Sequence, residues 1–233
     1  LESAGRRCLE NRRIELERAA ALRGKTAGAL TALVLVGAPP SSCAQPSELG
    51  VLELEPGQAE AEAAFHQVEL AIESGRFRDA LERARQAVAA LAADAGPMTR
   101  GLSEYAFGRA AIASADLAGA EPHLRAAFLA LRSANSSLAF AVATKMTEAL
   151  CESTKVALAR EWLGYAHAEA SRLELATSNR ALLELLASRV AEIEGDVAGA
   201  LTATERGLAI ADACAEPACR LAGLELRSGQ AIY

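Results

Sequence analysis

The sequence predicts an all-α fold, an α-solenoid of antiparallel helix hairpins preceded by a shorter helical hairpin. Two observations predict this fold. Hydrophobic residues make up 52% of the 233 residues but aromatic residues only 4%, and the dominant alanine and leucine favour helices over strands. In addition, an alanine recurs at a nearly constant interval after Gly57, and a period of this size is typical of helical solenoids.

Residues 1–40 are expected to form the leading helical hairpin, and residues 41–58 a linker. A charged amphipathic stretch over 1–23 predicts the first helix of this hairpin. The apolar run 26–38 predicts a second, short helix, which two prolines then end. This run has about thirteen residues, whereas a helix that spans a bilayer needs about 20. The charged segment before it is too long for a signal peptide, so we interpret the run as a buried helix.

Residues 59–233 contain the repeat, with four complete units and a truncated fifth. The recurring alanines are Ala80, Ala120, Ala159 and Ala200, at steps of 40, 39 and 41 residues. Each period holds two apolar-periodic stretches. The first helices are predicted at 59–73, 99–114, 137–152 and 179–194, with a fifth from Pro217, and the second helices at 77–93, 117–133, 155–173 and 197–213. An alanine at the start of each second helix lets the two helices of a hairpin approach closely.

Composition and motifs argue against nucleic-acid binding and catalysis. The formal net charge is −6, and glutamates interleave the basic cluster near the first residues, so no basic patch for a nucleic acid is predicted. A Gly-Lys-Thr run at 24–26 lacks the earlier glycine of a phosphate-binding loop, because Ala19 stands there. We expect no catalytic residue, no metal and no cofactor. The histidines do not pair at a metal-binding spacing; they are His66, His123 and His167.

The repeated part resembles the tetratricopeptide repeat, in a longer variant of about forty residues. If the recurring alanine opens the second helix, the family's later small position falls on Ala87, Ala127, Ala166 and Gly207. The small position within the first helix falls on Gly108 and, fitting less well, on Val68, Thr147 and Ser188. The family's aromatic positions are mostly absent. The resemblance implies a right-handed superhelix whose concave face binds a protein or peptide.

A second resemblance covers essentially the whole chain. The segment Arg7-Cys8-Leu9-Glu10, the later Gly37-Ala-Pro-Pro-Ser-Ser-Cys43 and the pair Trp162-Leu163 are similar to the C-terminal tetratricopeptide-repeat region of myxobacterial Ser/Thr protein kinases. This resemblance implies the sensing or docking arm of a membrane-anchored kinase. The arm would lie outside the cytoplasmic membrane or, alternatively, in the cytoplasm. No kinase motif is present in the sequence itself.

The sequence has five cysteines. Cys214 and Cys219 lie five residues apart near a helix end, without the further ligands that a zinc site needs. They are interpreted as structural cysteines or, in an oxidising compartment, as a disulfide. The kinase region carries cysteines at places that match Cys8 and Cys43, so the resemblance implies a Cys8–Cys43 bond if this arm is extracytoplasmic.

The expected binding surface is the concave groove, which the first helices line. The repeat register assigns ten residues to it: Glu62, Phe65, Glu69, Leu102, Tyr105, Arg109, Thr144, Glu148, Leu185 and Arg189. Four of them occupy one slot with alternating charge, in the order Glu69, Arg109, Glu148 and Arg189.

Two interpretations of this slot stay open. It forms either an internal ladder of salt bridges that sets the register of the repeats, or a polar clamp for a peptide beside the apolar anchors Phe65 and Tyr105. An Arg109→Glu substitution separates them, because only the ladder predicts a loss of stability without a partner.

We therefore expect a protein-interaction or sensor scaffold without catalytic activity, the non-catalytic part of a bacterial Ser/Thr kinase. The alternative is a stand-alone adaptor, or the repeat region of a transcriptional regulator or signalling ATPase. Both ends of the chain look cut, which suggests a fragment. The last predicted helix lacks its partner, so we expect fraying or self-association there.

Overall fold

The computed structural model describes residues 55–174 and 176–230, all of which belong to one compact unit, Cys43–Tyr233. Within these ranges the secondary structure is entirely α-helical, without a strand, and the predicted all-α class is confirmed for them. The helices are α2 (Gln58–Glu73), α3 (Phe77–Ala89), α4 (Pro97–Ala113), α5 (Leu117–Ser133), α6 (Leu138–Glu152), α7 (Val156–Arg172), α8 (Thr177–Glu194), α9 (Val197–Asp212) and α10 (Pro217–Gln230). The predicted hairpin over 1–40 lies outside the described residues, as does most of the linker.

The prediction differs most from the structure at the connection between α3 and α4. Helix α3 ends at Ala89 instead of residue 93, and α4 begins at Pro97 instead of residue 99. Proline is favoured at the first position of a helix because it has no N–H to leave unpaired there. Pro97 therefore sets the start of α4. The residues after Ala89 form the connection that leads to this start, and so they do not continue α3.

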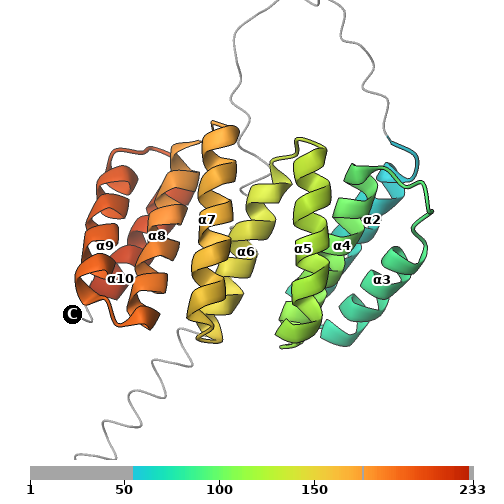
Figure 1. Ribbon diagram of the computed structural model, residues 1–233, viewed down its shortest axis with the longest axis horizontal. Helices are drawn as coiled ribbons and strands as arrows, with labels where there is room; N and C mark the ends of the chain where they lie inside the picture. Colours follow the sequence, from blue (N-terminus) through green and yellow to red (C-terminus); the bar gives the residue numbers. More distant parts are fainter. Residues whose placement is uncertain (1–54, 175, 231–233) are drawn as a thin grey trace, which may run out of the picture. The chain divides into compact units, whose positions relative to one another are not determined.

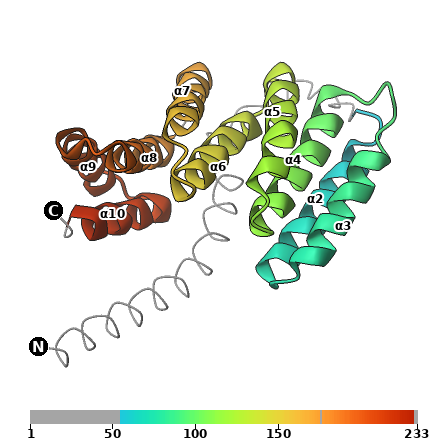
Figure 2. The ribbon, with the colours of Figure 1, turned by 60° about the horizontal axis from the view of Figure 1, so that its bottom comes forward.

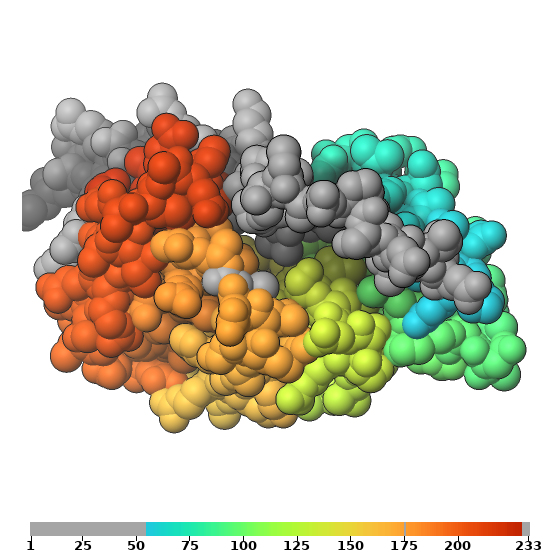
Figure 3. All heavy atoms as spheres, turned by 90° about the horizontal axis from the view of Figure 1, so that it is seen from above, coloured from blue at the N-terminus to red at the C-terminus, as the bar shows by residue number. Residues whose placement is uncertain are grey.

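Successive helices pack against their neighbours in chain order. The main contacts join α4 to α5, α6 to α7 and α8 to α9, and each of these pairs also contacts the helix that follows it. Helix α2 contacts α4 more extensively than it contacts α3. From α4 to α9 the helices succeed one another in sequence order (Figures 1 and 2), and at the other end α2 lies between α3 and α4 (Figure 2). The space-filling view from above keeps the same order of colours (Figure 3). None of the helices that the structure describes is both long and apolar enough to cross a bilayer.

The turn inside each helix pair has the same backbone geometry. One residue adopts a left-handed conformation at Gly75 (φ 70°), Ala115 (φ 60°), Thr154 (φ 55°) and Gly195 (φ 76°). The N–H of this residue and that of the next residue donate back to carbonyl oxygens of the preceding helix; at Ala115 the acceptor is Ile112, at 2.9 Å. This pattern is a Schellman C-cap, which satisfies carbonyls that the helix end leaves free. The four positions keep the steps of 40, 39 and 41 residues.

The recurring alanines lie in the core. Ala80, Ala120, Ala159 and Ala200 are all fully buried, at 0% exposure. At Gly108 an added Cβ would lie 2.4 Å from the side chain of Leu124, so α4 and α5 meet more closely than a larger residue permits. The less well fitting positions of the first helices, Val68, Thr147 and Ser188, are buried as well, and the Ser188 hydroxyl shares a 2.9 Å hydrogen bond with Thr204.

Candidate functional site

The predicted slot of alternating charges begins with a buried ion pair. Arg109 on α4 donates from Nη2 to Glu69 Oε2 on α2, at 2.7 Å, and the two side chains are only 8% and 12% exposed. The other carboxylate oxygen of Glu69 has no hydrogen-bond partner among the described residues. This pair therefore joins two helices in the interior, away from solvent.

The slot continues as a half-exposed network on α6, α8 and α10. Arg189 lies between two carboxylates, with Nη1 at 4.0 Å from Glu148 Oε1 and Nη2 at 2.8 Å from Glu225 Oε2. Glu148 also accepts a hydrogen bond from Lys145 Nζ at 2.8 Å. About a third of each of the Arg189 and Glu148 side chains is exposed, so these groups can exchange an internal contact for a contact with a partner.

The two carboxylates of the slot differ in their electrostatics. Burial raises the pKa of Glu69, although Arg109 opposes the shift. Burial acts in the same direction on Glu148, but the charges of Lys145 and Arg189 outweigh it, so that the pKa of Glu148 lies below its usual value. Glu148 is therefore a well-compensated anion, whereas Glu69 carries an uncompensated cost of desolvation.

The apolar members of the predicted groove are packed between helices. Phe65 stacks on Tyr105 with ring centroids 5.3 Å apart, and the two side chains are 5% and 2% exposed. Burial raises the pKa of the Tyr105 hydroxyl. Leu102, Leu185 and Thr144 are also less than 10% exposed.

Only three of the ten predicted groove residues present a sizeable surface. Glu62 is exposed, and Glu148 and Arg189 are half-buried. We call Glu148, Arg189, Lys145 and Glu225, which contact one another, the polar row. Glu62 lies on α2 and is not part of it. The repeat period could not indicate Glu225, which lies 36 residues after Arg189 instead of about forty. Lys145 could have been found, because it stands three residues before Glu148 on one helix, where side chains are neighbours.

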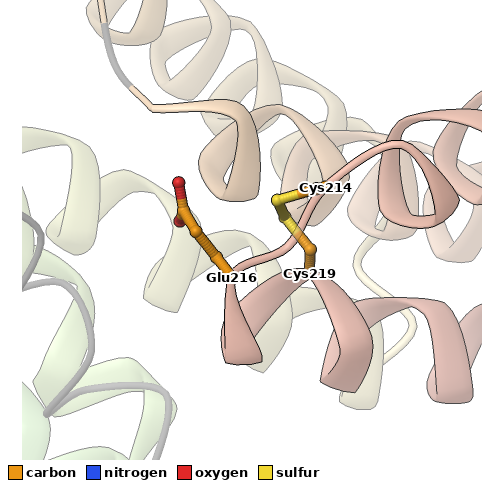
Figure 4. Close-up of side chains that lie close together, drawn as sticks. All are labelled: Cys214, Glu216 and Cys219. Carbon is orange, nitrogen blue, oxygen red and sulfur yellow. A yellow bond between two sulfur atoms is a disulfide. The ribbon is translucent and has the colours of Figure 1, made fainter.

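The described cysteines and histidines do not form a catalytic group. Cys151 is buried, and burial raises the pKa of its thiol to about 11. Cys214 and Cys219 form a disulfide that ties the end of α9 to α10, and Figure 4 shows Glu216 beside them. Their ligand atoms lie within 4.8 Å of one another, but sulfurs in a disulfide are not thiolates and cannot ligate zinc in the usual way. The predicted Cys8–Cys43 bond lies outside the described residues.

One histidine contacts a carboxylate on a neighbouring helix. His123 Nδ1 on α5 lies 2.5 Å from Glu104 Oε2 on α4, and its ring lies tilted against Phe107 with centroids 3.8 Å apart. This contact belongs to the packing between α4 and α5.

No family model matches this chain. Neither a curated protein nor a solved structure matches it. A function is therefore inferred from the helices, the turns and the polar row.

Proposed function

We propose that this chain is a protein-interaction scaffold, built as a right-handed α-solenoid of tetratricopeptide-like hairpins over residues 59–233. The observation that carries this proposal is the recurrence of one turn and one buried alanine at common steps of 40, 39 and 41 residues. In a solenoid each repeat buries its apolar surface on its neighbours, and the aligned first helices present one continuous face for binding.

The polar row is the part of this face that suits a partner. Its charges alternate along α6, α8 and α10, and they are held in place by one another at 2.8–4.0 Å. Side chains that are already oriented lose less entropy when a partner binds. An extended or helical peptide with charges of both signs fits such a surface.

The two interpretations of the charged slot thus apply to different parts of it. The burial of Glu69 and Arg109 supports a structural ladder at α2 and α4. The exposure of Glu148 and Arg189 supports a clamp at α6 and α8. Arg109→Glu should destabilise the protein without a partner, whereas Arg189→Gln should weaken partner binding and lower the free energy of unfolding by less than about 1 kcal/mol.

We further propose that the chain is the non-catalytic C-terminal region of a bacterial Ser/Thr kinase, as the second resemblance implies. The alternative is an adaptor, or the repeat region of a transcriptional regulator or signalling ATPase. The coding sequence upstream of Leu1 distinguishes these origins: kinase motifs support the first, and an ATPase domain or a regulator domain supports the second.

Site-specific photo-crosslinking in the producing cells tests the scaffold proposal. A benzoylphenylalanine at Glu62 or Lys145 should capture a defined protein. The same group at Glu82 or Arg85, whose exposed side chains lie on the second helix α3, is the matched control. Equal capture from both surfaces, or capture from neither, would contradict a binding face on the first helices.

A further inference from the structure

A cavity of about 470 Å³ opens beside the first helix pair. Its lining comes from the start of α2, from the end of α3 with the connection that follows, and from the start of α4. Alanine is the most frequent residue of the lining, and Ala61, Ala64 and Ala87 are among these alanines. A volume of this size lies within the range of about 300–1,000 Å³ that small-molecule sites occupy.

The next helix pair shows why this space is open. Helix α5 has 17 residues, and near its end Leu131 is fully buried against Gly101, where an added Cβ would lie 2.5 Å from Leu131 Cγ. Helix α3 has only 13 residues. Leu91, forty residues before Leu131, therefore lies beyond the end of α3 and lines the cavity, half-buried.

The small position near the middle of the second helix also differs between the first two pairs. Ala127 on α5 is fully buried, whereas its counterpart Ala87 on α3 is half-buried and lines the cavity. The volume that the second pair fills with its own side chains is thus left open in the first pair.

The cavity carries polar groups that the equivalent filled space lacks. Ser103 lines it and is 2% exposed, and in the described part of the chain its hydroxyl has no hydrogen-bond partner. The residue forty positions later is Ala143, which is fully buried and has no side-chain group that forms hydrogen bonds. Thr99 also lines the cavity; its hydroxyl donates to the Pro56 carbonyl at 3.2 Å and keeps its capacity to accept. A hydroxyl that faces a cavity and has no protein partner can pair with a ligand or with water.

The charges at the cavity are all negative. Glu60 and Asp94 are the ionisable residues of the lining, and both are exposed. Arg100 is not among the lining residues, and its guanidinium donates to the Ala93 carbonyl at 3.4 Å. The Glu55 carboxylate is occupied by the N–H groups of Met98 and Thr99, at 2.9 and 3.1 Å.

We propose that this cavity binds a small aliphatic amine that carries a hydroxyl at its other end. The alkyl chain packs against the alanine methyl groups, the hydroxyl pairs with Ser103 and Thr99, and the ammonium group lies at Glu60 and Asp94. The amine is chosen because the exposed charges favour a cation, and the hydroxyl because Ser103 has no partner. This site is independent of the polar row and of the proposed protein interaction.

Titration calorimetry of the full chain with three matched probes tests the site. 5-Aminopentan-1-ol should bind saturably and more tightly than pentylamine, and 5-hydroxypentanoate should not bind. Removing one neutral hydrogen bond by Ser103→Ala should weaken 5-aminopentan-1-ol about fivefold and leave pentylamine unchanged. Neutralising both carboxylates with Glu60→Gln and Asp94→Asn should weaken both amines about tenfold.

Ala87→Leu should abolish binding by filling the cavity, with circular dichroism as the check that the variant is folded. Glu82→Gln, an exposed carboxylate on the same helix, is the matched control and should bind as the wild type does. The proposal is overturned if the wild type binds none of the probes, or binds the carboxylate as well as the amine. It is equally overturned if Ser103→Ala weakens both amines alike, or if a folded Ala87→Leu variant binds unchanged.

Discussion

Substituting methionine for Arg109 removes one half of the buried ion pair between α2 and α4. Glu69 then keeps its place in the interior, 12% exposed, without the guanidinium that lies 2.7 Å from its Oε2. Its Oε1 already has no hydrogen-bond partner among the described residues. Breaking a buried pair from one side typically costs about 3–5 kcal/mol. Because the charge of Lys145 also acts on Glu69, we expect the lower end, about 3 kcal/mol.

The double variant Glu69→Leu/Arg109→Met separates the cost of an orphaned charge from the value of the pair. Replacing both partners by apolar residues is often neutral, so the double variant should lie within about 1 kcal/mol of the wild type. The exposed pair Arg76–Asp79, at 3.6 Å and with both side chains more than half exposed, is the control. Asp79→Ala should cost less than about 1 kcal/mol.

Urea unfolding measures these differences with two probes. Circular dichroism reports the helices, and the fluorescence of Trp162, the chain's single tryptophan, reports the fully buried surroundings of α7. The reasoning would be refuted by a loss of less than 1 kcal/mol in the single variant at an unchanged m-value, or by a double variant that is no more stable than the single one.

Three further predictions concern other parts of the chain. Thr154→Gly should raise the free energy of unfolding in urea by about 1 kcal/mol, since Thr154 has a φ of 55°; a loss would show that the turn is not strained. The lowered pKa of Glu148 means that its contribution is present above the unfolded pKa and is lost as the pH falls through the folded pKa. Glu148→Gln should therefore be less stable than the wild type at pH 7 and equal to it near pH 3, and a constant difference in urea titrations would contradict this. Cys214→Ser should lower the free energy of unfolding by about 2 kcal/mol. A reductant should cause the same loss in the wild type and should leave the variant unchanged.

Most of the helix boundaries could be predicted because their signals are local. Apolar periodicity and the recurring alanine located the helices to within a residue or two, and Pro217 indicated the start of α10 correctly. The end of α3 was missed because Val88 and the alanines after it continue a helical pattern, whereas the position of Pro97 decides where the chain must turn. Ala115 and Thr154 carry no glycine signal, so only the alignment with Gly75 indicates their left-handed backbone.

The sequence predicted which residues of the candidate site are aligned on neighbouring helices, but not which of them are buried. The period placed Glu69 opposite Arg109, and the structure brings them together. Whether a side chain on the inner face reaches solvent depends on the distance between neighbouring helices. This distance cannot be predicted from the period of the repeat. Phe65 and Tyr105 were expected as anchors for a partner, but their rings stack on each other and are buried, so they present little surface to a partner. The cavity also escaped prediction, because it results from the length of one helix.

The connections between the helix pairs differ from one another, and this difference has a mechanical consequence. The turn after Ser133 repeats, at Asn135, the left-handed residue and the hydrogen bonds of the turns inside the pairs, and the Cys214–Cys219 disulfide ties α9 to α10. The longer stretch between Ala89 and Pro97 has no such residue and lacks this pair of hydrogen bonds. Under a pulling force, this stretch should extend first, before tension changes the spacing of Arg189 and Glu225.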